Sequence, residues 1–165
     1  MRRVVDTAAA LISGLIAVAL LLTLFNSNEG RSADDWDRDV NAAVIQLARD
    51  YTLPVTEARP RTVICEHVRP GHSVPECAKY IEAISEHSDS VDSIKDRLNY
   101  LAENAPQGVS AEHRHDARQM ADALAILTDA NHLIVTGWAE SDDAKWQQGW
   151  SRFEDALTAM GQVYQ

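Results

Sequence analysis

The sequence has few of the residues, and none of the motifs, that mark most catalytic sites. It contains two cysteines and seven glycines in 165 residues, and the glycines never cluster into a phosphate-binding loop. The zinc-protease motif H-E-x-x-H, the hydrolase motif G-x-S-x-G and the haem-attachment motif C-x-x-C-H are also absent. Because no nucleophile can be paired with a base, we expect a protein that is not an enzyme and needs no cofactor.

Positive charge is scarce as well. The 15 Lys and Arg residues are outnumbered by 25 Asp and Glu residues, which gives a net charge of −10 at pH 7. Binding to a phosphate backbone requires clustered cations, so nucleic acid is not an expected partner. An acidic surface instead favours a basic protein as a partner.

One stretch, residues 7–25, lacks charge altogether and is rich in Leu, Ile, Val and Phe. A helix of this length would measure about 28 Å, close to the roughly 30 Å of a bilayer's hydrocarbon core. We therefore predict a transmembrane helix that acts as an uncleaved signal anchor in a lipid bilayer. A cleaved signal peptide is the alternative, but residues 26–31 lack a small-x-small cleavage site.

The charges on either side of this predicted span determine its expected orientation. Two arginines precede it and four aspartates follow it closely, and the side rich in Lys and Arg normally stays in the cytoplasm. We therefore expect residues 1–6 to be cytoplasmic and residues 26–31 to form a short tether. Residues 32–165 are then a periplasmic or extracellular domain of a single-pass protein of the cytoplasmic membrane.

A face of small residues within the predicted span could pack against a neighbouring transmembrane helix. Its members recur at helical spacing: Ala10, Ser13, Gly14 and Ala17. Such residues let two helix backbones approach closely, although small residues are also common in membrane spans without any such role.

After residue 31, apolar residues recur with a period near 3.6, and strand patterns are nearly absent. A first helix is predicted from Ser32, its N-cap, to about Tyr51. Pro54 and Pro60 predict a connection over residues 52–61, because proline removes a backbone hydrogen bond from a helix.

Three later stretches continue the helical pattern. A helix capped by Ser73 is predicted to be interrupted at residues 88–90 and to resume until about Leu101. Another helix is predicted from Ser110 to about Val135, and a last one follows a Ser141 cap. The predicted fold is therefore all-α, with a single N-terminal transmembrane helix followed by a bundle of four to five helices.

The two cysteines, Cys65 and Cys77, predict a disulfide bond, because both fall in the expected extracytoplasmic domain where disulfides persist. A loop of this size contributes about 3 kcal/mol in the chain-entropy picture. The alternative is a metal site made by Cys65, His67, His72 and Cys77, since two thiolates and two imidazoles suit zinc. Its spacing matches none of the usual ligand patterns, and it requires reduced thiols.

Three of the four tryptophans, Trp138, Trp146 and Trp150, lie within 13 residues. The ordinary interpretation of such a stripe is core packing, because Trp and Phe dominate buried area. Tryptophan is also enriched at binding hot spots, which makes these residues candidates for a partner surface. Gly149, next to Trp150, would let another backbone approach closely.

The leading hypothesis is a membrane-anchored module that works by contact, as an accessory, assembly or regulatory subunit among other membrane-protein subunits. The first alternative is a sensor or carrier that binds a small ligand or metal in the bundle, which requires His132, or His67 with His72, to face a cavity. A phage or plasmid lysis or exclusion factor is a further alternative, because short anchored helical proteins serve such roles.

Overall fold

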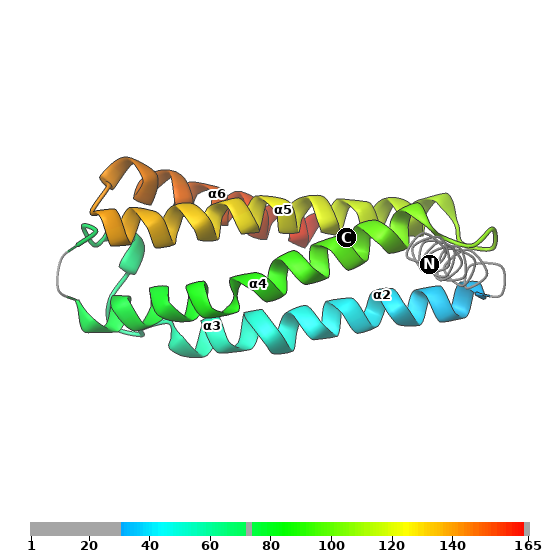
Figure 1. The fold of residues 1–165 in the computed structure, drawn as a ribbon, viewed down its shortest axis with the longest axis horizontal. Coiled ribbons are helices and arrows are strands. Elements are labelled where there is room, and N and C mark those ends of the chain that lie inside the picture. The colour runs from blue at the N-terminus through cyan, green and yellow to red at the C-terminus, as the bar shows by residue number, and fades with distance from the viewer. Residues whose placement is uncertain (1–30, 72–73, 164–165) are drawn as a thin grey trace, which may run out of the picture.

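A computed structural model describes residues 31–71 and 74–163 of the chain. Within these residues four long helices run up and down and pack side by side (Figure 1). They are α2 (Ala33–Leu47), α4 (Pro75–Glu103), α5 (Ala111–Glu140) and α6 (Asp143–Val163). No strand occurs in this part of the chain. The predicted all-α bundle is confirmed.

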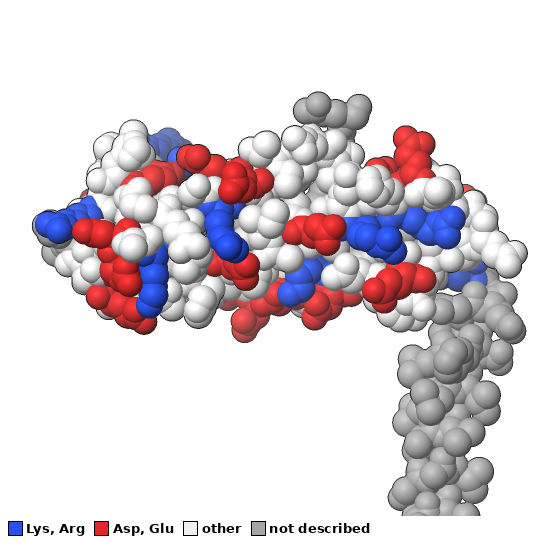
Figure 2. Space-filling view, turned by 90° about the horizontal axis from the view of Figure 1, so that it is seen from above, with Lys and Arg blue, Asp and Glu red and all other residues white. Residues whose placement is uncertain are grey.

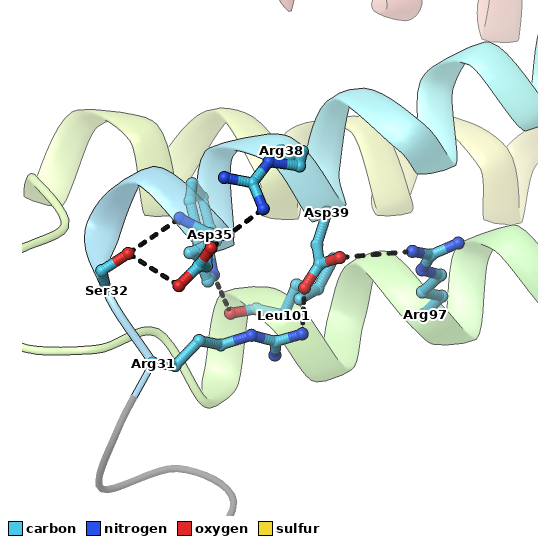
Figure 3. Close-up of polar contacts among 8 residues, drawn as sticks. Arg31, Ser32, Asp35, Arg38, Asp39, Arg97 and Leu101 are labelled. Atoms are coloured by element: carbon cyan, nitrogen blue, oxygen red, sulfur yellow. Dashed lines mark hydrogen bonds and ion pairs between the residues drawn. The ribbon is translucent and has the colours of Figure 1, made fainter.

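The start of α2 is held to α4 by polar contacts (Figure 3). Ser32 caps the helix as predicted, because its Oγ accepts a hydrogen bond of 3.1 Å from the Asp35 backbone N–H. The Trp36 indole donates to the carbonyl oxygen of Leu101 at 2.8 Å. Asp39 is paired with Arg31, the first described residue. The chain is therefore fixed to the bundle from residue 31 onward.

The first helix does not end at Tyr51, and the predicted connection at Pro54 is wrong. A π-helical turn (Ala48–Thr52) follows α2 and leads directly into the short helix α3 (Leu53–Ala58). Pro54 lies in the first turn of α3, where its missing N–H costs least. The wider π-turn therefore lets the helical path continue through the proline, and the connection begins only after α3.

The predicted interruption at residues 88–90 is also wrong, because α4 is continuous from Pro75 to Glu103. Ser88 donates its hydroxyl to the Ile84 carbonyl of the preceding turn at 2.6 Å, a bond that accommodates serine inside a helix. Ile84, Val91 and Leu98 are all fully buried. Their seven-residue spacing keeps one face of the helix in the core across the serines.

Two predicted helix caps also differ from the structure. The residue that precedes α4 is Val74, which makes no side-chain cap bond, and Ser73 lies outside the described residues. Ser141 ends α5 in a left-handed conformation with φ of 56°. The cap of α6 is Asp142, whose carboxylate accepts from the backbone N–H groups of Ala144 and Lys145.

Helices α5 and α6 approach closely at two glycines. A Cβ atom on Gly149 would lie 2.8 Å from the backbone nitrogen of Ile134, and one on Gly137 would lie 2.6 Å from that of Trp146. The close approach expected at Gly149 therefore occurs within the chain. Because α6 has 21 residues and α5 has 30, α6 covers only part of the length of α5 (Figure 1).

The predicted membrane span and its small-residue face, residues 7–25, lie outside the described residues, as do residues 1–6 and 26–30 of the flanking segments. None of the helices in residues 31–71 and 74–163 is long and apolar enough to cross a bilayer.

Candidate partner-binding groove

The predicted disulfide bond between Cys65 and Cys77 is present, with the two Cα atoms 5.6 Å apart. It ties a 3-10 turn (Cys65–His67) to the first turn of α4, and both cysteines are buried. The alternative metal site therefore loses both sulfur ligands, because each sulfur is bonded to the other. His67 is exposed, and His72 lies outside the described residues.

The three tryptophans form an aromatic cluster at the end of the bundle that carries the α5–α6 turn. Trp146 contacts Trp138 and Trp150, with ring centroids 5.4 Å apart in each pair. Trp150 also stacks on Tyr80 of α4 at 5.9 Å. Trp146 and Trp150 are 0% and 5% exposed, so they attach α6 to the core and offer no surface to a partner. Trp138 is half-buried.

The histidines of the described chain do not gather into a metal site. No group of three His, Cys, Asp or Glu side chains in residues 31–71 and 74–163 has the geometry to hold a metal ion. His132 is exposed and lines a hollow of about 460 Å³ between α4 and α5. The amide of Asn131 lies beside it, accepts a hydrogen bond of 2.8 Å from the Tyr51 hydroxyl and is otherwise buried.

A groove runs along the side of the bundle where α2 faces α6. Helix α2 packs against α4, and α6 packs against α5, but α2 and α6 do not pack extensively on each other. Two hollows follow one another along α2: the larger, about 350 Å³, is lined mainly by α2 and α5 with Val163 of α6, and the smaller, about 140 Å³, has three residues of α6 in its lining. We call them together the α2–α6 groove. Its apolar walls come from both sides: Val40, Val44, Leu47, Leu157, Met160 and Val163.

The groove is open beyond the point where the described part of α6 ends. Helix α6 runs antiparallel to α5 (Figure 1), and its last described residue, Val163, lines the same hollow as Met120 of α5. The part of α5 that precedes Met120 therefore has no described residue of α6 opposite it. Apolar side chains that would be covered in a closed bundle remain accessible, and Leu157 is 51% exposed.

Charged side chains differ between the two ends of the groove. The larger hollow, near the start of α2, is lined by Asp37, Asp116 and His113. The His113 ring nitrogen Nδ1 lies 3.5 Å from the Asp37 carboxylate. Arg59 is the single charged residue among the described residues that line the smaller hollow, and it hydrogen-bonds Glu66 at 3.1 Å.

The negative charge of the chain is not gathered into one patch on the face seen in Figure 2. Acidic and basic side chains alternate there, with uncharged surface between them. Several charged side chains of the described residues are paired, as Arg152 is with Asp129 at 2.7 Å. The attraction of a basic partner is therefore expected to depend on particular carboxylates rather than on the net charge alone.

Comparison with protein-family models, with curated protein sequences and with solved structures finds no match for this chain.

The groove could not be located from the sequence. Val40, Val44, Leu157 and Met160 follow the same helical spacing as the buried positions, so the pattern assigns them to the core face. The one useful feature was the shorter apolar stripe of the last helix, because a short helix leaves part of its neighbours uncovered.

Proposed function

We propose that this chain is a single-pass membrane protein whose extracytoplasmic helical domain works by contact, as an accessory, assembly or regulatory subunit of a membrane complex. The observation that carries the proposal is the open α2–α6 groove. Exposed apolar surface in a concave groove is typical of sites that bind a helix of another protein. The absence of catalytic motifs from the sequence agrees with a role in binding.

The attachment of Arg31 gives a second reason. Arg31 is paired with Asp39, and it follows the predicted membrane span after only five intervening residues, 26–30. Such a segment reaches at most about 20 Å when fully extended. The domain is therefore expected to stay close to the membrane surface, where it meets other membrane proteins rather than soluble ones.

The test is photo-crosslinking of the full chain in its native membrane. A photoreactive amino acid replaces Leu157 in the groove, and in a matched chain it replaces Ile45, which is 67% exposed but does not line the groove. We expect a defined membrane protein to crosslink at position 157 only. The same protein should co-purify in mild detergent with the wild type and with Ile45→Asp, and be lost with Leu157→Asp. Equal crosslinking at both positions, or none, would contradict the proposal.

A small-ligand sensor or carrier is the second candidate function, and it is favoured by the hollow between α4 and α5. His132, Thr128 and Asp92 line this hollow, and Thr128 donates to Asp92 at 3.0 Å. Asn131 also lines it, and its side-chain nitrogen is buried without a hydrogen-bond partner in the described chain. A thermal-shift screen of the full chain against metals, haem and small metabolites tests this candidate, and the absence of any shift would exclude it in favour of the contact module.

A further inference from the structure

We infer that the α2–α6 groove binds one amphipathic helix of a neighbouring membrane protein, and that this helix carries Lys or Arg at the end that meets Asp37 and Asp116. The inference rests on the proposed function and adds the chemistry and the direction of the partner. Three features of the described residues support it: the length of the groove, the distribution of charge along it, and its position relative to the tether.

The length of the groove suits a single helix. Its wall follows α2, the π-turn and α3 from Asp37 to Val55, which is about 27 Å at 1.5 Å per residue. A partner helix of about five turns has the same length and buries one apolar stripe. Leu157 and Met160 from α6 line the smaller hollow together with Leu47 from α2, so such a stripe would contact both helices.

The charge along the groove determines the direction of the partner helix. Asp37 and Asp116 come from two different helices, α2 and α5, and line the same hollow. Arg59 is the charged residue at the other end. A helix carries partial positive charge at its N-terminus and partial negative charge at its C-terminus. The N-terminal end of the partner, with its Lys or Arg side chains, is therefore expected beside the two aspartates, so that the partner runs parallel to α2.

The position of the groove restricts the partner to the same membrane. Asp37 lies in the second turn of α2, two residues before Asp39, which pairs with Arg31. The acidic end of the groove therefore lies at the end of α2 that directly follows the tether. A helix presented by a neighbouring membrane protein reaches this end without having to cross the length of the bundle.

One other occupant fits less well, and a second is distinguished by experiment. Residues 7–25 of this chain are apolar but carry no charge, so they would leave both aspartates of the groove without a cation. A second copy of this chain is the other occupant, and the cross-linking experiment identifies it directly, because the product would then contain only this chain.

The test uses the full chain in phosphatidylcholine nanodiscs, with empty nanodiscs as the blank, because a neutral lipid does not attract a cationic peptide. Three fluorescent 18-residue helical peptides share one leucine stripe. The first carries three Lys in its N-terminal turn, the second carries three Glu there, and the third carries the three Lys in its C-terminal turn. We expect the first to bind about tenfold more tightly than either of the others by fluorescence anisotropy.

Matched variants assign the binding to the groove. Asp37→Asn combined with Asp116→Asn should reduce the preference for the first peptide to less than about threefold, since the amides keep the size of the side chains but not their charge. Leu157→Asp should weaken all three peptides, and Ile45→Asp should weaken none. Circular dichroism of each variant confirms that the helices are retained.

The outcomes separate this inference from the proposed function. If the three peptides bind equally tightly, and Leu157→Asp weakens all three, the inferred charge and direction of the partner helix would be wrong. The groove would still be a site that binds a helix. Binding that Leu157→Asp does not weaken would overturn the groove as the binding site. A crosslink from position 157 to another copy of this chain would show that the occupant is a second copy and would overturn the inference.

Discussion

The hydroxyl oxygen of Ser90 in α4 lies 3.3 Å from the carbonyl oxygen of Asp50 in the π-turn. In an α-helix the carbonyl of Asp50 would accept a hydrogen bond from the backbone N–H four residues later. That residue is Pro54, whose nitrogen carries no hydrogen. The single hydroxyl hydrogen of Ser90 is shared between this carbonyl and the His87 carbonyl of its own helix, which is the nearer acceptor. This contact gives the Asp50 carbonyl a partner from α4, while the π-turn itself lets the helical path continue through Pro54.

Ser90→Ala is predicted to lower the free energy of unfolding by about 1 kcal/mol, because the buried side of the π-turn loses a hydrogen-bond donor. Chemical denaturation followed by circular dichroism measures the change. Ser93→Ala in the same helix is the control, since Ser93 is exposed and should change the stability by less than about 0.5 kcal/mol. Equal effects of the two substitutions would show that the bond to Asp50 contributes nothing.

Reduction of the Cys65–Cys77 disulfide is predicted to lower the free energy of unfolding by about 3 kcal/mol, because the bond restricts a loop in the unfolded chain. Urea denaturation with and without a reductant measures this difference. The double variant Cys65→Ser with Cys77→Ser should be as unstable as the reduced wild type and insensitive to the reductant. If the reductant does not change the free energy of unfolding of the wild type, and two reactive thiols are found before reduction, the disulfide bond is absent.

Gly149→Ala is predicted to destabilise the domain by about 1–3 kcal/mol, because the new methyl group would lie 2.8 Å from the Ile134 backbone and the two helices would have to separate. Gly161→Ala in the same helix is the matched control. A Cβ atom there meets nothing within 4 Å, so alanine should stabilise α6 by about 0.5 kcal/mol through its helix propensity. Thermal denaturation of the two variants should therefore give shifts of opposite sign.

Tyr51→Phe is predicted to lower the free energy of unfolding by about 1–2 kcal/mol at pH 8. The substitution removes the hydroxyl that donates a hydrogen bond to the side-chain oxygen of the buried Asn131. Burial raises the pKa of the Tyr51 phenol above its ordinary value of 10.0. Above that pH the unfolded chain ionises while the folded chain stays neutral, so the stabilisation by the buried phenol decreases as the pH rises.

The free energies of unfolding of wild type and Tyr51→Phe should therefore approach each other by about 1 kcal/mol between pH 10 and pH 11. Urea denaturation at pH 8, 10 and 11 measures both curves. Tyr80, whose pKa burial also raises, is retained in both proteins and cancels in the difference. A difference that stays constant over this range would show that Tyr51 is not buried as described.

Several local features could be predicted from a few neighbouring residues. The predicted cap of α2 by Ser32 is confirmed, because a serine that precedes an apolar helical stripe has its hydroxyl in reach of the backbone N–H three residues on. The predicted start of a helix at Ser110 agrees with α5, which Ser110 caps in the same way. The helices themselves followed from the 3.6-residue period. The Cys65–Cys77 bond followed from the expected compartment and from the presence of only two cysteines.

The predictions were wrong at segments where the preferences of neighbouring residues were outweighed by hydrogen bonds formed in the folded chain. Pro54 and residues 88–90 each disfavour a helix on local grounds. In the fold, Ser90 bonds the π-turn next to Pro54, and the serines themselves are accommodated by backbone carbonyls of α4. The two segments predicted as interruptions also lie against each other, because Ser90 contacts the Asp50 carbonyl 40 positions away.

By itself, the sequence determined that the described chain is helical, where most of its helices begin, and that its two cysteines pair, because periodicity, caps and composition act over short stretches of chain. The tertiary structure decided which apolar faces are covered. Trp146 and the exposed Leu157 follow the same stripe of α6, but only Trp146 meets other helices on all sides. That difference depends on the lengths and packing of α2, α5 and α6, which no single stripe encodes.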